Sequence, residues 1–279
     1  MEDMNSFSKI GEGQDAEVYA IEDNKVLKLF RNANDEKVAL REMEILKTMY
    51  RSGLLVPKVH EYVNISSRPG FVMERITGNS ILSTVEKRPY IMLRVSKMFG
   101  QYHSDIHKFV APVEIPLLKE GLERSITAVH CLDDEIIQYT LKLLSELPDG
   151  NCICHGDYNP SNVIINGDSP VFLDWGGVSR GDAASDVAHT LLILKNGQFP
   201  PNTSFLFKLA LKLGRNAFAN IYFRTYQHYN QLDLSVLSKW EMVRAVGRLS
   251  YGGEEERPAL VKYIKKFYEN KGNNRVNLF

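Results

Sequence analysis

The chain has few cysteines, no long apolar run and no excess of charge, and each absence removes a class of protein. Only three cysteines occur in 279 residues, and they lack the spacing of a disulfide-framed secreted domain. The longest apolar stretches, such as residues 191–194, are far shorter than the ~20 residues that a membrane span requires. The first residues are acidic and polar, without the apolar core of a signal peptide. We therefore expect a soluble, cytoplasmic protein.

Basic and acidic side chains balance at 34 each. Such a balance argues against binding to nucleic-acid polymers or membranes through a basic surface. The aromatic content of 10% argues against disorder. The balance is a cancellation, because residues 180–279 carry 15 basic and eight acidic side chains and the preceding part carries the opposite excess. No feature of the sequence points to an obligate protein partner.

Secondary-structure signals divide the chain into two parts. Strand signals lie at 17–21, 25–30, 59–63 and 71–74, with one amphipathic helix that Asp35 can cap and that runs to Met49. Helix signals lie at 91–107, 135–147, 187–194, 205–229, 235–249 and 259–268. A hairpin signal interrupts them, with strands at 163–165 and 171–173 and a turn at 166–168. We predict an α+β fold with a small N-terminal antiparallel sheet lobe containing one helix (1–76) and a larger, mainly helical C-terminal lobe (77–279).

Two glycines one residue apart open a candidate phosphate-binding segment. Gly11 and Gly13 allow the backbone to approach a phosphate closely and to point N–H groups toward it. A dinucleotide-binding loop requires a strand before it and a helix after it. Here a strand follows, so a glycine-rich hairpin covering nucleotide phosphates is the better interpretation. An ordinary glycine turn is the alternative when this segment is taken alone.

Lys28 lies in the middle of the predicted strand at 25–30, between apolar residues. A lysine in this position can contact nucleotide phosphates if a carboxylate holds it in place. Glu42, on the following helix, is the candidate partner. Glu44 points about 200° away around that helix and should face solvent. Taken alone, Lys28 is also compatible with an ordinary exposed strand lysine.

The strongest signal is the segment His-Gly-Asp-Tyr-Asn-Pro-Ser-Asn at 155–162, followed by Asp-Trp-Gly at 174–176. Phosphoryl transfer requires a carboxylate that accepts the proton of the substrate hydroxyl, and oxygen ligands that fix Mg²⁺ on the phosphates. Asp157 and Asn162 precede the predicted hairpin and Asp174 follows its second strand, so we expect the hairpin to bring the three to one end. The chance of five fixed residue types matching at these spacings is on the order of 10⁻⁴.

Together these segments resemble the aminoglycoside phosphotransferase/choline kinase family, a branch of the protein-kinase-like fold. The resemblance covers nearly the whole chain. The motifs that carry it are Gly-x-Gly-x-x-Ala-x-Val at 11–18, Lys28, Glu42, His-Gly-Asp-x-x-x-x-Asn at 155–162 and Asp-Trp-Gly at 174–176. Residues 71–78 are similar to the family's interlobe hinge, which holds adenine through its backbone, and residues 181–188 to the helix-capping segment after its metal-binding aspartate.

The resemblance implies a bilobal protein-kinase-like fold and a kinase that uses ATP, with GTP possible, and Mg²⁺. The phosphate would pass to a hydroxyl of a small molecule. Asp157 is implied as the catalytic base, and Asn162 and Asp174 as ligands of Mg²⁺. His155 is implied to brace the catalytic loop and Asp186 to stabilise it from below. The residues implied in nucleotide binding are Gly11, Gly13, Ala16, Val18, Lys28 with its partner Glu42, Met73, Glu74 and Ile76.

Some positions depart from the pattern. Ala16 stands in place of a third glycine and Asn159 where many relatives have histidine, but neither change removes a group that the chemistry requires. Protein kinases typically carry arginine at the position of Gly156, and no Ala-Pro-Glu follows Asp174, which favours a small-molecule acceptor. Protein-kinase-like activity and a nucleotide-binding pseudo-enzyme that serves as an interaction module are the alternatives. The acceptor itself is open among aminoglycosides, amino alcohols, sugars and vitamin alcohols.

Two other features have a simpler interpretation. His103 and His107 lie four residues apart on a predicted helix, a spacing that can bind metal, but the sequence places no third ligand near them. Packing or a place in a substrate wall is therefore preferred. Cys152 and Cys154 are separated by one residue, unlike the two of zinc and redox motifs, and are interpreted as buried thiols. The aromatic residues of 218–229 are interpreted as core.

Overall fold

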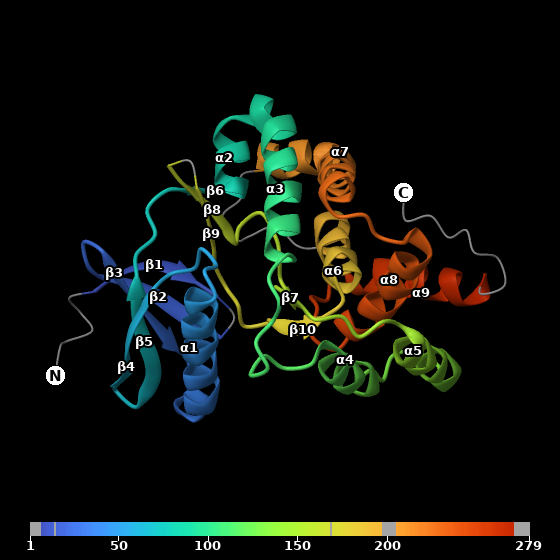
Figure 1. Ribbon diagram of the computed structural model, residues 1–279, viewed down its shortest axis with the longest axis horizontal. Coiled ribbons are helices and arrows are strands. Elements are labelled where there is room, and N and C mark those ends of the chain that lie inside the picture. Colours follow the sequence, from blue (N-terminus) through green and yellow to red (C-terminus); the bar gives the residue numbers. More distant parts are fainter. Residues whose placement is uncertain (1–6, 14, 168, 197–204, 271–279) are drawn as a thin grey trace. The chain divides into compact units, whose positions relative to one another are not determined.

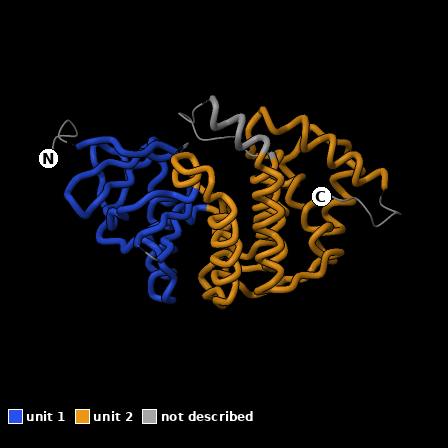
Figure 2. Tube along the Cα trace, turned by 90° about the horizontal axis from the view of Figure 1, so that it is seen from above, with its two compact units in different colours: residues 1–81, 161–176 blue, residues 82–160, 177–279 orange. Residues whose placement is uncertain are grey.

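The computed structural model describes residues 7–13, 15–167, 169–196 and 205–270. These fall into two compact units, shown in separate colours in Figure 2. Unit 1 comprises Met1–Ile81 and Ser161–Gly176, and unit 2 comprises Leu82–Pro160 and Gly177–Phe279. The domain boundary after residue 76 stays a prediction. The units divide the chain differently from it, because 161–176 groups with the N-terminal sheet. Within the described residues, no helix combines the length and apolarity needed to cross a membrane.

Unit 1 is built on an antiparallel sheet with the strand order β1-β2-β3-β5-β4 (Figure 1). Its strands are β1 Ser8–Glu12, β2 Ala16–Glu22, β3 Lys25–Phe30, β4 Val59–Ile65 and β5 Arg68–Glu74. The four strands expected from the sequence are confirmed. The first strand was not predicted, because Ser-Lys-Ile-Gly-Glu contains a single strong strand former.

The strands of unit 1 are held by a small apolar cluster and one helix. Leu27, Leu29 and Val72 are buried together on neighbouring strands. Helix α1 (Glu36–Arg51) packs against β4 and β5. It buries most of the stripe that the sequence predicted, including Ile45, Leu46 and Met49, whereas Val38, at its start, is 53% exposed. Asp35 occupies the N-cap position of α1, as the sequence predicted, but its side chain makes no capping hydrogen bond to this helix. Its carboxylate accepts the backbone and side-chain N–H groups of Asn32, because a 3-10 turn at Ala33–Asp35 intervenes.

A second, smaller sheet completes unit 1. It has the order β6-β8-β9, formed by Asn79–Ser80, Val163–Asn166 and Ser169–Phe172. The β8–β9 pair is the hairpin that the sequence predicted. The tip of its turn, residue 168, lies outside the described residues. The hairpin's ends position the residues at 162 and 174, which flank its two strands.

Unit 2 is mainly helical. Its helices are α2 Ile81–Lys87, α3 Met92–Ile106, α4 Leu118–Thr127, α5 Asp134–Glu146, α6 Ala183–Asn196, α7 Phe205–Tyr229, α8 Leu234–Arg248 and α9 Arg257–Glu269. A short 3-10 turn at Pro89–Ile91 precedes α3, and β7 (Cys152–Cys154) pairs with β10 (Ser179–Gly181). The two short helices α2 and α4 were not predicted, since they are only seven and ten residues long. The six longer ones were.

Helix α6 is the buried centre of unit 2. It packs against α7, α8 and β7, and Figure 1 shows it between α7 and α8. Val187, Ala188 and Leu191 have no exposed surface, and polar residues on other faces, Asp186 and Thr190, are also fully buried. A helix buried on all sides offers no solvated face to a charged residue. Any carboxylate on it must therefore find its partners inside the protein.

Helices α3 and α7 approach each other closely, with aromatic side chains between them. A Cβ at Gly100 would lie 2.5 Å from the carbonyl oxygen of Tyr222, so only glycine allows this spacing. Phe218, Tyr222 and Tyr226 are buried, which confirms the core interpretation for them, whereas Tyr229 is 46% exposed.

Glu241 on α8 is a buried carboxyl group whose ionisation costs stability. Its side chain is 2% exposed, and among the described residues its Oε1 has no hydrogen-bond partner. Burial raises the pKa of Glu241 to about 8, although nearby Lys195 acts in the opposite direction. The usual value is near 4.5, so the folded state keeps this proton at neutral pH and the unfolded state releases it. Below pH 4.5 the Glu241 carboxyl group is protonated in both states and does not reduce the free energy of unfolding. As the pH rises from 4.5 toward 8, only the unfolded state loses the proton, and the free energy of unfolding falls.

Replacing Glu241 by glutamine should therefore stabilise the protein in a pH-dependent way. We expect a gain of about 3 kcal/mol at pH 7 and about 1 kcal/mol or less at pH 5, because glutamine has no proton to lose. Urea unfolding at both pH values measures the difference. Glu44→Gln, at an exposed position of α1, is the matched control and should change little at either pH. An equal gain at both pH values would contradict the pKa of Glu241.

Candidate active site

The glycine-rich segment forms the β1–β2 hairpin of unit 1. Gly11 lies in β1, opposite Val18 in β2. The Gly13 N–H donates to the carbonyl oxygen of Ala16 at 2.8 Å and closes the turn. The order is thus strand, turn, strand, which a dinucleotide-binding loop does not have. The prediction that a strand follows the glycines is confirmed, and the four predicted residues lie together on one hairpin.

Lys28 is held by carboxylates within unit 1. Its Nζ lies 2.5 Å from Glu42 Oε1 and 3.8 Å from Asp174 Oδ1. The side chains of Lys28 and Glu42 are only 16% and 9% exposed, while Glu44 is exposed. The sheet register explains the placement of the lysine, because Lys28 lies in the central strand between Val18 and Phe71.

The electrostatics of this cluster keep the lysine charged. Burial alone lowers the pKa of Lys28, but the carboxylates of Glu42 and Asp174 outweigh burial and raise the pKa above its usual value. Burial raises the pKa of Glu42, and the charge of Lys28 acts against this rise. The result is an ammonium group fixed in direction by two carboxylates, able to face an anion. Phosphate oxygens are the anions that such lysines commonly contact.

Asn162 and Asp174 lie at the two ends of the β8–β9 hairpin. The N–H of Leu173 donates to the Asn162 carbonyl oxygen at 2.8 Å, which extends the ladder beyond both strands. Asp174 has a φ of +60°, a left-handed conformation that costs a non-glycine residue about 1 kcal/mol or more. Trp175 anchors the turn, since it is fully buried and its Nε1 donates to the Phe172 carbonyl oxygen. The Asp174 carboxylate is 55% exposed, so the strained turn presents it outward.

The predicted hinge residues lie at the end of β5 and just beyond it. Met73 is paired with Val26 in β3, and Glu74 is the last residue of the strand. The backbone N–H of Glu74 donates to the carbonyl oxygen of Lys58, and the Glu74 carboxylate accepts the backbone N–H of Lys58. Ile76 follows two residues later, outside the sheet. Their predicted contact with adenine stays a prediction.

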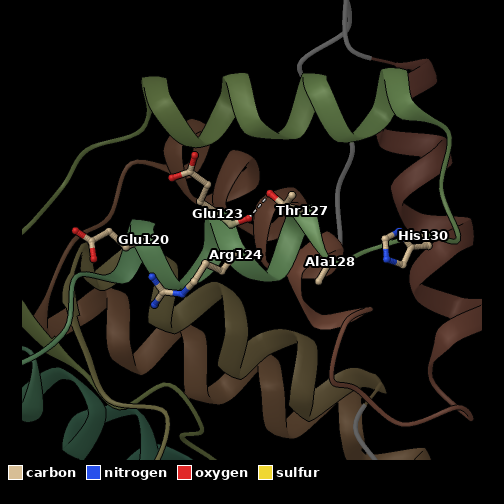
Figure 3. Close-up of a pocket in the computed structure, with 6 residues that line it drawn as sticks. All are labelled: Glu120, Glu123, Arg124, Thr127, Ala128 and His130. Carbon is tan, nitrogen blue, oxygen red and sulfur yellow. Dashed lines mark hydrogen bonds between the residues drawn. The ribbon is translucent and has the colours of Figure 1, made fainter.

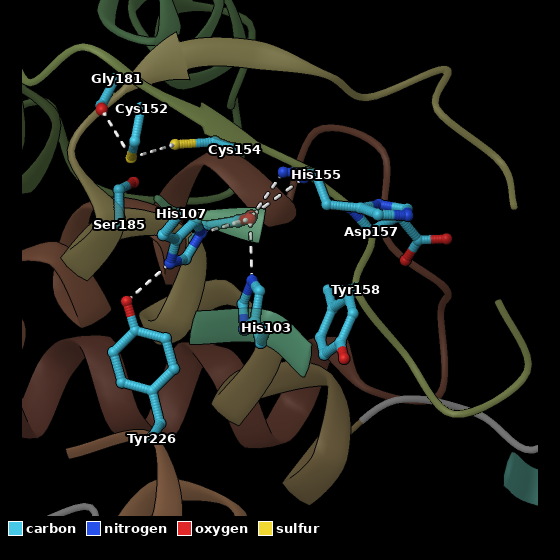
Figure 4. A network of polar contacts seen from close by, with 12 residues as sticks. His103, His107, Cys152, Cys154, His155, Asp157, Tyr158, Gly181, Ser185 and Tyr226 are labelled. Atoms are coloured by element: carbon cyan, nitrogen blue, oxygen red, sulfur yellow. Dashed lines mark hydrogen bonds and ion pairs between the residues drawn. The ribbon is translucent and has the colours of Figure 1, made fainter. Parts of the chain in front are cut away.

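The loop that carries Asp157 belongs to unit 2 and is fixed by Asp186. The Asp186 carboxylate accepts the backbone N–H groups of His155 at 2.6 Å and Gly156 at 2.9 Å. It also contacts the Nε2 atoms of His103 at 3.0 Å and His107 at 3.2 Å. Figure 4 shows His103, His107 and His155 close to one another, with dashed lines marking their contacts. Four donors from two segments, α3 and the loop after β7, therefore meet at the first turn of α6.

The charge of Asp186 is stable in this environment. Burial raises its pKa, but the hydrogen bonds from His103 and His107 outweigh burial and hold the pKa well below its usual range. The Nε2 atoms of both histidines then act as N–H donors to an ionised carboxylate. A buried carboxylate with four donors fixes the loop geometry through the backbone. His103 and His107 are both buried, which confirms the prediction that they pack inside the protein.

The side chain of Asp157 has a partner that the sequence did not reveal. Asn159 Nδ2 donates to Asp157 Oδ2 at 3.1 Å and also reaches the Asp157 carbonyl oxygen at 3.3 Å. The Asp157 N–H points to Nδ1 of His155 at 3.3 Å. Tyr158 lies between Asp157 and Asn159 in the sequence. It is fully buried, and its hydroxyl donates to the carbonyl oxygen of Phe99. The only available signal for Asn159 was its two-residue separation from Asp157, which alone predicts no contact.

Gly156 is required by its backbone conformation. Its φ is +79°, and a Cβ there would collide with the carbonyl oxygen of Gly177. No side chain can be accommodated without moving the backbone. This explains why the chain has no arginine at this position, the residue that protein kinases typically carry there.

One surface hollow lies apart from these motifs. It has a volume of about 600 Å³ and is lined by Glu120, Glu123, Arg124, Thr127, Ala128 and His130 (Figure 3). All six residues are exposed, on α4 and the segment after it. Without a buried polar group to orient a ligand, the hollow does not define a binding site.

A profile of the phosphotransferase enzyme family matches residues 6–231. The chain belongs to this family, and the resemblance found in the sequence is confirmed. It is accordingly a phosphotransferase with a hydroxyl group as acceptor. A search of curated protein sequences finds no match.

Solved structures share the fold. The aminoglycoside-3'-phosphotransferase of type VIII is 18% identical over 87% of this chain and 93% of its own, with a TM-score of 0.60. A thermostable mutant of aminoglycoside phosphotransferase APH(4)-Ia is 12% identical over 96% and 95%, with a TM-score of 0.65. Amicoumacin kinase hAmiN, in complex with AMP-PNP, Ca²⁺ and Ami, is 14% identical over 98% and 91%, with a TM-score of 0.60. The predicted α+β, protein-kinase-like fold is therefore confirmed.

Proposed function

We propose that the protein transfers the γ-phosphate of ATP to a hydroxyl of a small molecule. The observation that carries this proposal is Lys28, held between Glu42 and Asp174 in unit 1. An ammonium group held by a buried carboxylate, with a second, exposed carboxylate close by, is the kind of arrangement that phosphoryl transfer uses to hold phosphates. Solved structures of the same fold contain GDP, ADP or AMP-PNP. These ligands support a nucleotide as the phosphate donor.

The donor side of the reaction falls to residues of unit 1. Gly11, Gly13, Ala16 and Val18 line the hairpin whose backbone would cover the phosphates, and Met73, Glu74 and Ile76 would hold the base. Asn162 and Asp174 offer oxygen donors, the ligand type that Mg²⁺ prefers. When bound, Mg²⁺ neutralises charge on the phosphates.

The acceptor side falls to the loop at 155–159. Asp157 would accept the proton of the attacking hydroxyl, and Asn159 holds one of its carboxylate oxygens at 3.1 Å. His155 and Asp186 keep the loop backbone in place. The glycine at position 156, in place of the arginine that protein kinases typically carry, supports a small acceptor over a protein.

A substrate screen tests the proposal. Mg²⁺ and ATP or GTP are supplied with aminoglycosides, choline, ethanolamine, sugars and vitamin alcohols, and nucleotide consumption is followed, with Asp157→Ala as the blank. We expect acceptor-dependent consumption by the wild-type chain alone. Nucleotide binding without transfer to any acceptor would favour the pseudo-enzyme alternative. Phosphate transfer to a protein but to none of the small molecules would overturn the acceptor class.

Loss of the lysine's partner should weaken nucleotide use. Replacing Glu42 by glutamine leaves Lys28 with a neutral partner in a half-buried position, so the ammonium group loses its fixed direction. We expect kcat/KM for the nucleotide to fall about 10-fold to 100-fold, corresponding to about 1.4–2.7 kcal/mol. Steady-state kinetics measure the change. Glu44→Gln on the same helix is exposed and should leave the value unchanged; equal effects of both substitutions would contradict the assigned pairing.

A further inference from the structure

Next to the loop at 155–159, unit 2 brings together two thiols and an imidazole that the proposed reaction does not use. Cys152 and Cys154 lie on β7, and His107 is the residue that ends α3. One ligand atom from each residue, two sulfurs and a ring nitrogen, lies within 4.8 Å of the other two. Figure 4 shows the two thiols beside each other and His107 below them. Cys154 and His107 are buried and Cys152 is half-buried.

The strand explains why a one-residue spacing brings two thiols together. Alternate residues of a strand point to the same face, so Cys152 and Cys154 both project from one side of β7. Their sulfurs are 4.0 Å apart. Two thiolates bound to one tetrahedral zinc ion at 2.3 Å lie about 3.8 Å apart. Zinc motifs usually separate their cysteines by two to four residues, but in an extended strand a separation of one residue is enough.

His107 has the hydrogen bonds of a metal-binding histidine. Its Nε2 lies 3.2 Å from the carboxylate of Asp186 and its Nδ1 lies 2.6 Å from the hydroxyl of Tyr226. Metal-binding histidines commonly donate their second ring N–H to a carboxylate, which fixes the tautomer. With Nε2 donating to Asp186, Nδ1 carries the lone pair. The Tyr226 hydroxyl is then the group that a metal ion would displace.

We propose that Cys152, Cys154 and His107 form a binding site for Zn²⁺, with Nδ1 as the nitrogen ligand. Two sulfurs and one imidazole are a donor set that zinc accepts. In the free protein the thiols face the carbonyl oxygens of Gly181 at 3.1 Å and Asp182 at 3.5 Å. Binding replaces these weak contacts and releases the two thiol protons to solvent. The site is separate from Lys28, Asn162 and Asp174, and does not depend on the proposed reaction.

The position of the proposed zinc site links it to the loop that carries Asp157. The strand that carries the two cysteines continues directly into His155, and Asp186, the partner of His107, also accepts the His155 N–H. Occupancy of the site therefore acts on the same carboxylate that fixes the catalytic loop.

Titration with Co²⁺ tests the proposal, because Co²⁺ reports its ligands by absorption. The untagged full chain is stripped of metal with a chelator, titrated with Co²⁺ and then with Zn²⁺. We expect a thiolate-to-metal charge-transfer band and intense tetrahedral d–d bands that saturate at one equivalent. Binding of Co²⁺ to the metal-free chain should release two protons, followed with a pH indicator. Zn²⁺ should then abolish both sets of bands by displacing Co²⁺, without further proton release. Absence of these bands in the wild-type chain overturns the proposal without any variant.

Variants identify the ligands. Cys152→Ser and Cys154→Ser should each weaken Zn²⁺ binding by at least 100-fold, more than the 10–100-fold that loss of an outer partner costs. Cys131→Ser is the matched control, since Cys131 is an exposed free thiol, and should bind like the wild type. Tyr226→Phe should bind more tightly because the competing hydroxyl is gone. Loss of the bands in the Cys131 variant, or their retention without Cys152 and Cys154, overturns the assignment.

Discussion

Replacing Asp157 by asparagine is expected to lower kcat by about 10³-fold, because a general base contributes roughly 10²–10⁴-fold to proton transfer. The amide has nearly the same shape and can still accept the Asn159 hydrogen bond through its oxygen. The loop backbone is held by Asp186 and not by this side chain. The affinity for nucleotide should therefore stay within about threefold of the wild-type value, about 0.7 kcal/mol. Steady-state kinetics with the acceptor found in the screen, together with calorimetric nucleotide binding, measure both quantities.

The matched control for this substitution is Asp23→Asn, an exposed carboxylate in the turn between β2 and β3. It removes the same charge from the chain and should leave kcat unchanged. A near-normal kcat in the Asp157 variant would show that another group accepts the proton. A parallel loss of nucleotide affinity would show instead that Asp157 serves binding.

Replacing Asp186 by asparagine should have the largest effect on stability. The substitution leaves one oxygen for four donors and points an NH₂ group at N–H groups inside a fully buried site. Removing one partner of a buried charged network costs about 3–5 kcal/mol. Since a domain is stable by only about 5–15 kcal/mol, unfolding should shift to much lower urea concentration. Catalytic activity should fall as well, because the N–H groups of His155 and Gly156 lose their common anchor.

Asp105→Asn on α3 is the control for this second experiment. Its carboxylate pairs with Lys108 at 2.6 Å but is 40% exposed, and such surface pairs contribute about 0–1 kcal/mol. We expect a small change in unfolding for this variant. If Asp186→Asn unfolds at the same urea concentration as the control, the carboxylate does not anchor the loop.

Local sequence patterns explain how much of the fold could be predicted. Strand alternation around Lys28 and the amphipathic stripe of α1 are fixed by neighbours in sequence, so both elements were predicted near their observed bounds. Helices α2 and α4 were missed because short helices offer few periodic positions. The N-cap position of Asp35 was predicted, but the partner of its carboxylate was not, because the 3-10 turn at Ala33–Asp35 has no sequence pattern of its own.

The candidate site likewise contains residues that the sequence predicted and one contact that it did not. His155, Asp157, Asn162 and Asp174 belong to contiguous motifs whose spacing reflects the chemistry. Asn159 could not be recognised as a partner of Asp157, because the contact depends on the turn of the loop.

By itself the sequence determined the family, the fold class and the residue types that phosphoryl transfer needs, because these are written in short motifs and in local periodicity. Only the tertiary structure decided which distant groups share a space. His107 and Cys152 are 45 positions apart in the chain, yet α3 and β7 bring their ligand atoms within 4.8 Å of each other. Asp186 meets His155 and His103 for the same reason. The physical cause is the burial of α6, because its Asp186 carboxylate has no access to solvent and finds its donors on α3 and on the loop after β7.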